Sequence, residues 1–259
     1  MANVNEAMKK HAAEQAARQA AGQPAPAVPW GSPQAAPSIA GRPLRLPLGP
    51  CARNLVVHYD RAGGIAEEYR ALRNALLSHF REKRFCLLVT SAEPREGTTV
   101  TCLNLALALA EDRDRRTIVV DCNLRRGRVA ALLRTAPGPG VADVLRGAAT
   151  LPDATWGTGY PNLYAIPAGR ASAHEVIPLF QRPTLDDLVA DLRRRFDYIL
   201  LDSPPVRVVP DVGYLGRVAP HALLVVRLHK TPRHHISQAL ALLHAANIAP
   251  LGLALTHRQ

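Results

Sequence analysis

Short apolar runs alternate with helical stretches over most of this 259-residue chain. The runs that predict buried strands cover residues 85–90, 117–121, 162–167, 197–202, 221–228 and 251–256. Apolar residues at helical spacing predict helices over residues 65–80, 98–111, 183–196 and 232–246. Strands that alternate with helices favour the α/β class, with a doubly wound, mostly parallel sheet covered by helices on both faces.

Residues 1–50 have a different composition from the rest of the chain. Residues 1–21 are rich in Ala, Gln and Lys, and residues 23–50 are dense in Pro, Gly, Ala and Ser. Such a segment buries too little apolar surface to hold a fold. We therefore expect a disordered Ala/Pro-rich tail at 1–50, acting as a linker or a docking segment, and one α/β domain at 51–259.

The overall charge permits an anionic partner but does not identify one. The formal net charge is +11 and the pI about 10.2, yet the arginines are scattered and rarely interleaved with aromatic residues, so nucleic-acid binding is not favoured. The four cysteines show no metal-ligand spacing, and they suit a reducing cytoplasm. No apolar stretch approaches the roughly 20 residues of a membrane span. We expect a cytoplasmic protein, peripheral to the inner membrane through a partner.

Three loops leave predicted strands at the edge of the sheet where ligands bind in open α/β folds. The first, residues 91–99, joins a strand to a helix in the manner of a phosphate-binding P-loop. The other two follow strands that end in Asp121 and Asp202. An acid in this place can hold Mg²⁺ or accept a hydroxyl proton, whereas its plainer role is to cap the turn that follows. Together the three loops indicate an ancestral nucleotide site.

The first loop lacks the lysine that such loops use. Gly97 and Thr99 occupy the positions of the last glycine and the metal-binding hydroxyl, but Thr98 stands where the lysine belongs. Arg95 replaces a glycine of the loop. Loss of the lysine removes the main point charge on the phosphates, and a side chain at position 95 crowds the backbone cradle.

These residues belong to a set of segments that resembles the cytoplasmic domain of bacterial tyrosine kinases of the CpsD, CapB and Wzc type. The resemblance covers about residues 54–256. Besides the three loops, the matching segments are the Glu67, Arg70 and Arg73 helix (an ExxRxxR element), the stretch Gly140–Gly147, Ile166-Pro-Ala-Gly169 and Phe196–Pro205.

The resemblance implies roles for particular residues. Thr99 and Asp202 would bind the magnesium of Mg-ATP, and Asp121 would act as a base beside it. Arg95, Gly97, Thr98, Asn123 and Arg125 would be the remaining, degenerate nucleotide-binding positions. In the family, the residues matching Glu67, Arg70 and Arg73 build a homo-oligomer interface; the alternative is a solvated helix face paired with itself.

The chain also departs from the family's pattern at several nucleotide positions. Besides Thr98 and Arg95, Asn123 replaces a second aspartate, and Thr256 replaces an adenine-contacting asparagine. The family's C-terminal tyrosine cluster is absent, because the last tyrosine is Tyr214. Several losses in one site favour relaxed selection on catalysis.

The sequence therefore favours a pseudokinase: a regulator of capsular or exopolysaccharide biosynthesis and export with an impaired ATP site. It would act by docking to, and oligomerising with, a membrane polysaccharide copolymerase that regulates chain length. The alternatives are an active ATP-dependent protein-tyrosine autokinase and a partitioning-type switch ATPase.

Overall fold

The computed structural model describes residues 30, 54–80, 82–134 and 138–257. The predicted tail at 1–50 lies outside the described residues, apart from Trp30. The described residues from 54 onward form the fold.

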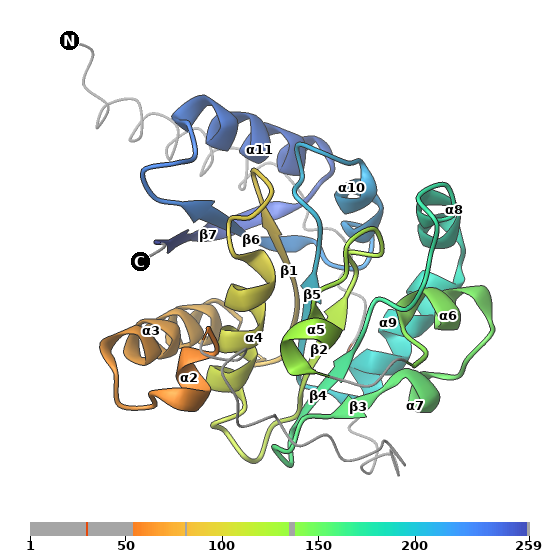
Figure 1. The fold of residues 1–259 in the computed structure, drawn as a ribbon, viewed down its shortest axis with the longest axis horizontal. Coiled ribbons are helices and arrows are strands. Elements are labelled where there is room, and N and C mark those ends of the chain that lie inside the picture. Colours follow the sequence, from red (N-terminus) through yellow and green to blue (C-terminus); the bar gives the residue numbers. More distant parts are fainter. Residues whose placement is uncertain (1–29, 31–53, 81, 135–137, 258–259) are drawn as a thin grey trace. The chain divides into compact units, whose positions relative to one another are not determined.

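A seven-stranded sheet forms the centre of the domain, in the order β3-β4-β2-β5-β1-β6-β7 (Figure 1). All neighbouring strands are parallel except β3, which pairs antiparallel with β4. The mostly parallel α/β fold predicted from the sequence is thus confirmed. The strands are β1 Phe85–Ser91, β2 Thr117–Asp121, β3 Trp156–Gly157, β4 Leu163–Ile166, β5 Tyr198–Asp202, β6 His221–Arg227 and β7 Ala249–Thr256.

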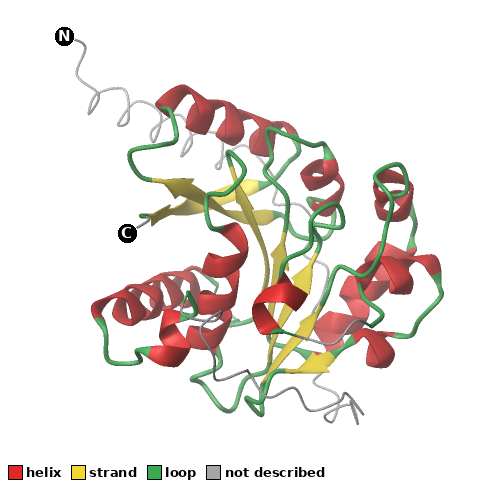
Figure 2. Ribbon diagram, in the orientation of Figure 1, coloured by secondary structure: helices red, strands yellow, loops and turns green. Residues whose placement is uncertain are grey.

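Helices cover both faces of the sheet (Figure 2). Helix α4 packs on β1, β2 and β5, and α3 packs on the outside of α4. Helix α11 and helix α3 lie on opposite sides of β6 and β7 (Figure 1). The helices are α2 Val56–Tyr59, α3 Gly64–His79, α4 Thr98–Leu109, α5 Val129–Leu133, α6 Val141–Arg146, α7 Leu151–Ala154, α8 Val176–Gln181, α9 Thr184–Arg195, α10 Asp211–Leu215 and α11 Arg233–Ala245.

The core explains why the central strands read as unbroken apolar runs. Every residue of β1, β2 and β5 is buried, because helices cover them on both sides. Helix α4 is also apolar nearly all round, and its residues Thr101–Leu109 are all buried between α3 and the sheet. These central elements place the carboxyl ends of three strands at one edge.

The long elements end within two residues of their predicted bounds, but several short ones escaped prediction. Helices α2, α5, α6, α7, α8 and α10 have four to six residues, and β3 has two. Segments this short do not complete two helical turns, so their apolar residues show no period. They are held by tertiary contacts such as those between α8 and α10.

Candidate functional site

The ends of β2, β5 and β1 lie side by side at the centre of the sheet, and they bring the three predicted loops together. Asp121 is level with Asp202 in the register of β2 and β5, and Asp202 is level with Val89 of β1. The chain then leaves β1 through the loop 92–97 and enters α4 at Thr98. Two acids and one phosphate-type loop therefore converge at the carboxyl edge, as the sequence predicted.

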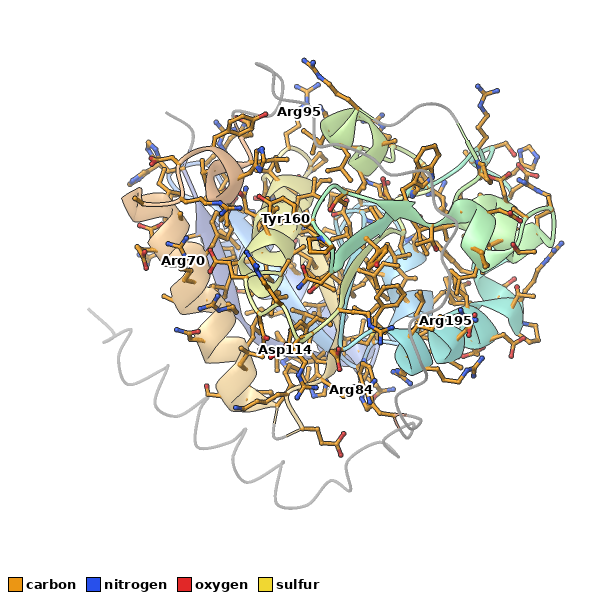
Figure 3. All side chains as sticks on the ribbon, turned by 90° about the horizontal axis from the view of Figure 1, so that it is seen from below. Arg70, Arg84, Arg95, Asp114, Tyr160 and Arg195 are labelled. Atoms are coloured by element: carbon orange, nitrogen blue, oxygen red, sulfur yellow. The ribbon has the colours of Figure 1, made fainter. Side chains whose placement is uncertain are left out.

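The loop after β1 includes two residues in the left-handed region of backbone conformation. Gly97 has φ +93°, which glycine adopts without strain. Arg95 has φ +67°, which is uncommon for a residue with a Cβ and explains why glycine suits this position better. Its side chain is exposed (Figure 3).

Two N–H groups at the start of this loop already have an anionic partner. The backbone N–H groups of Ala92 and Glu93 both donate to Oε2 of Glu96, each at 3.0 Å. The hydroxyl of Thr231 donates to the other oxygen of that carboxylate. Glu96 is 3% exposed, and burial raises the pKa of its carboxyl. Glu96 thus occupies two backbone N–H donors at the start of its own loop.

Thr256, at the end of β7, also contacts the loop. Its hydroxyl donates to the carbonyl of Glu96 at 2.7 Å, and its methyl group lies 3.5 Å from the position of a Cβ on Gly97. At the position where relatives are expected to place an adenine-contacting asparagine, this chain therefore has a side chain directed at its own loop.

A polar cluster, which the sequence did not indicate, lies next to the loop. Arg207, from the loop after β5, pairs with Glu93 and donates to Oε1 of Gln238 at 3.0 Å. Nδ1 of His235 lies 3.0 Å from the same Glu93 carboxylate. Arg207 lies only two residues after the Phe196–Pro205 segment, but no spacing rule indicates that it would reach the loop after β1.

Asp121 is a buried carboxylate whose hydrogen bonds hold the turn after β2. Its oxygens accept the backbone N–H of Asn123 at 3.2 Å and that of Val129 at 3.0 Å. Burial raises the pKa of its carboxyl even though these N–H groups favour the charged form. A Cβ on Gly127 would lie 2.9 Å from Asp121 and 2.4 Å from Ala168, so only glycine fits there. Asp121 therefore has the turn-capping role.

Asp202 is equally buried but has no such partners. It is 1% exposed, and neither carboxylate oxygen makes a hydrogen bond to any other described residue. Burial, and then the charge of Asp121, raise the pKa of its carboxyl well above its usual range. The Thr99 side chain lies close enough to lower that pKa, although no hydrogen bond of ordinary geometry joins the two.

The unsatisfied oxygens of Asp202 fit a hard divalent cation. Magnesium prefers oxygen ligands and is usually held by one or two carboxylates together with the phosphates of a substrate. Asp202 and Thr99 would be its protein contacts here, with Asp121 beside them. Among the described residues no three His, Cys, Asp or Glu side chains form a metal-binding group. A bound cation would polarise a phosphate oxygen. Its site would therefore be complete only when a phosphate group is also bound.

The two other predicted nucleotide residues of the second loop are engaged within the chain. Oδ1 of Asn123 accepts the Arg126 backbone N–H at 3.2 Å. Arg125 forms a two-pronged ion pair with the buried Asp211 of α10, at 2.8 and 2.9 Å, and donates to the Ala173 carbonyl at 3.1 Å. The structure thus shows that Arg125 attaches the second loop to α10. Its contact with a nucleotide stays a prediction.

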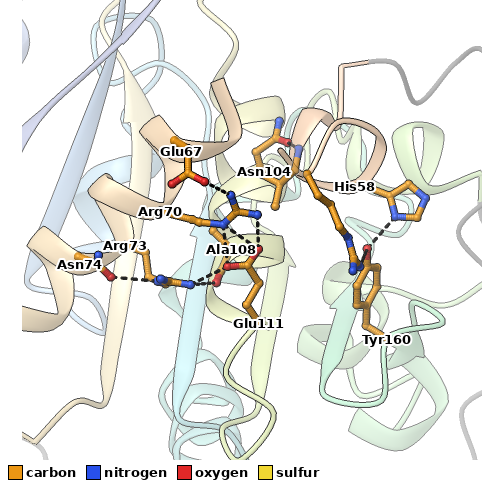
Figure 4. Close-up of polar contacts among 11 residues, drawn as sticks. His58, Glu67, Arg70, Arg73, Asn74, Asn104, Ala108, Glu111 and Tyr160 are labelled. Carbon is orange, nitrogen blue, oxygen red and sulfur yellow. Dashed lines mark hydrogen bonds and ion pairs between the residues drawn. The ribbon is translucent and has the colours of Figure 1, made fainter. Parts of the chain in front are cut away.

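The arginines of the ExxRxxR element converge on Glu111, just beyond the end of α4 (Figure 4). Arg70 donates to Glu111 through Nε at 3.0 Å and Nη2 at 2.7 Å, and to Glu67 at 2.5 Å. Arg73 donates to Glu111 at 2.8 Å and to the Ala108 carbonyl at 2.9 Å. The hydrogen bond from Arg70 is the main cause of the lowered pKa of Glu111. The motif therefore has a structural role within one chain.

Comparisons with known proteins point to one group of relatives. No protein-family model matches the chain. The tyrosine-protein kinase Wzc of Salmonella typhimurium is 30% identical over 164 residues, which are 62% of this chain and 22% of Wzc. The tyrosine-protein kinase CpsD of Streptococcus pneumoniae serotype 4 is 28% identical over 194 residues, 73% of this chain and 83% of CpsD. The chain thus matches about a fifth of Wzc but most of CpsD.

Solved structures agree with these relatives. The tyrosine kinase domain of BceF superposes with a TM-score of 0.70 at 26% identity, over 78% of this chain and 81% of that domain. The kinase domain of the Escherichia coli tyrosine kinase ETK, at 24% identity, shares the fold with a TM-score of 0.75 over 83% of this chain and 82% of that domain. The cell division ATPase MinD of Pyrococcus furiosus has a TM-score of 0.56 at 27% identity, over 66% of this chain and 71% of MinD.

In none of the described helices is there a stretch long and apolar enough to cross a bilayer.

Proposed function

Since this chain carries a domain of the bacterial tyrosine kinase family, of the Wzc and CpsD type, we propose that it is a catalytically impaired member of that family. It regulates capsular or exopolysaccharide biosynthesis and export from the cytoplasm, by docking to a membrane polysaccharide copolymerase and oligomerising with it. Thr98 in place of the phosphate lysine is the observation that carries this proposal.

The surroundings of Thr98 support the impairment. Residues 92–98 include no lysine, the Arg95 side chain is exposed, and Arg207 already pairs with Glu93. Loss of one charge-assisted contact to a phosphate weakens binding by about 1.5–3 kcal/mol. In phosphoryl transfer the effect is larger, because charge on the phosphate oxygens is stabilised mainly by such contacts.

An active autokinase is the second candidate, and the acid Asp202 favours it. The unpaired carboxylate, the nearby Thr99 hydroxyl and Asp121 retain the metal side of the site. In that case a tyrosine of a partner, or one elsewhere in the chain, receives the phosphoryl group. A switch ATPase of the partitioning type is the third candidate, on the likeness to MinD.

Mg-ATP binding and phosphotyrosine formation decide between the first two candidates. We expect no phosphotyrosine and no micromolar ATP binding for the wild-type chain, and a gain of ATP binding for the double variant Arg95→Gly with Thr98→Lys. The matched control is Arg95→Gly alone, which relieves the left-handed backbone without supplying the charge. Phosphotyrosine that appears in the wild type and disappears in Asp121→Ala would overturn the pseudokinase.

Assembly is tested separately with the arginines of α3. We expect the double variant Arg70→Ala with Arg73→Ala to lower the oligomer mass measured by light scattering. Glu111→Gln is the control, because it removes their partner within the chain while leaving both arginines available to a second copy. Equal masses for the wild type and the double variant would leave these arginines with the structural role alone.

A further inference from the structure

An open hollow lies at the carboxyl edge of the sheet, between the loop after β2 and the loop after β4. Its volume is about 510 Å³, within the range of small-molecule sites. Gly127, on its wall, is packed against Asp121, so the hollow adjoins the acidic pair without including it. The lining residues are Leu124, Arg125, Arg126, Gly127, Gly169 and Arg170, with Ala171, Ser172 and Glu175 beyond them.

Two arginines of this lining have side chains without a partner among the described residues. Arg126 and Arg170 are exposed, and neither side chain makes a hydrogen bond or an ion pair there. This sets them apart from Arg125, whose guanidinium is taken by Asp211. Elsewhere in this structure arginines that face carboxylates pair with them, as Arg70 and Arg73 do with Glu111.

Glu175, the acid among the described lining residues, does not neutralise them. Glu175 accepts the Ser172 backbone N–H at 2.8 Å and the Ser172 hydroxyl, and it lies 3.5 Å from Arg146. The Ser172 hydrogen bond is the main reason why the pKa of Glu175 is lowered to about 2. Its charge is thus directed at Ser172 and Arg146, and the hollow keeps an excess of positive charge.

We propose that this hollow binds a phosphate monoester, presented by a phosphorylated tyrosine side chain of another protein. Two arginines that line one hollow and have no carboxylate partner suit a dianionic group, because a planar guanidinium can donate two hydrogen bonds to phosphate oxygens. The volume leaves room for an aromatic ring behind the phosphate. The inference does not depend on ATP binding, since no residue of the loop 92–97 lines the hollow.

The experiment is calorimetric titration of the full chain with O-phospho-L-tyrosine at low salt. We expect Arg126→Gln with Arg170→Gln to weaken binding at least tenfold. The matched control is Lys83→Gln with Arg113→Gln, which removes the same charge from exposed positions before β1 and β2, at the opposite edge of the sheet. That variant should bind within twofold of the wild type.

Three results would overturn the proposal. Equal losses in both double variants would mean general attraction to a basic protein, and an unchanged affinity in the Arg126 and Arg170 variant would place the ligand elsewhere. ADP without magnesium, titrated in parallel, distinguishes the source of the phosphate. Tighter binding of ADP than of phosphotyrosine, lost in the same variant, would assign the hollow to a nucleotide. None of these results depends on whether the P-loop variants bind ATP.

Discussion

The ends of β2 and β5 differ although their sequences look alike. Both strands are buried along their whole length, both end in an aspartate, and the two aspartates are level in the sheet. Asp121 accepts backbone N–H groups of the turn that follows it, whereas Asp202 accepts no hydrogen bond from any residue that the structure describes. The comparison teaches that one acid contributes hydrogen bonds to the fold, while the other is kept at a cost to stability. The second is the better mark of a retained ligand site.

The largest effect is expected from neutralising the unpartnered acid. A buried acceptor without hydrogen bonds costs about 1–3 kcal/mol, and more when it is charged, so Asp202→Asn should raise the free energy of unfolding by about 3 kcal/mol at pH 8. Urea denaturation without magnesium measures it. A loss of stability in this variant would mean that Asp202 is satisfied by contacts like those of Asp121, and the contrast between the two strand ends would fail.

The pH dependence of this gain has a definite sign. The pKa of Asp202 is raised in the folded chain, so the folded state holds a proton that the unfolded state releases near pH 4. The wild type therefore loses stability as the pH rises from about 4 through the folded pKa, and the advantage of Asp202→Asn should shrink on acidification. Magnesium with a phosphate ligand should stabilise the wild type more than this variant.

A smaller effect is expected from crowding the turn beside the satisfied acid. In Gly127→Ala the new Cβ would meet Ala168 at 2.4 Å and Asp121 at 2.9 Å. Overpacking of this kind costs about 2 kcal/mol, measured as a lower urea midpoint with an unchanged slope. Gly157→Ala is the control, because no atom lies within 4 Å of a Cβ there. Equal midpoints for both variants would show that the turn after β2 moves freely.

The smallest effect is expected for Asp121→Asn. The amide keeps one oxygen as an acceptor but loses the other, so one of the two N–H groups of the turn is left without a partner. Stability should fall by about 1 kcal/mol, opposite in sign to Asp202→Asn. Thermal unfolding of the two variants side by side gives the answer. A shift of the same sign in both would erase the distinction between the strands.

The fold could be predicted further than the site, for reasons visible in particular residues. Apolar runs and helical periods depend on neighbours in sequence, and they located the long elements and the edge where Asp121 and Asp202 meet. The partners of those acids depend on contacts across the chain. Nothing in the sequence indicates that Val129 reaches back to Asp121, that Thr256 donates to Glu96, or that Glu111 binds both arginines of α3.

The attachment of Glu111 to α3 has a mechanical consequence. Helix α4 begins at the phosphate-type loop and runs for 12 residues, about 18 Å, to the segment that Arg70 and Arg73 hold. A second copy that bound either arginine would free the C-terminal end of α4. The N-terminal end of the same helix carries the loop. Self-association and ligand binding at the loop would then be coupled. Each would change the equilibrium constant of the other by the same factor.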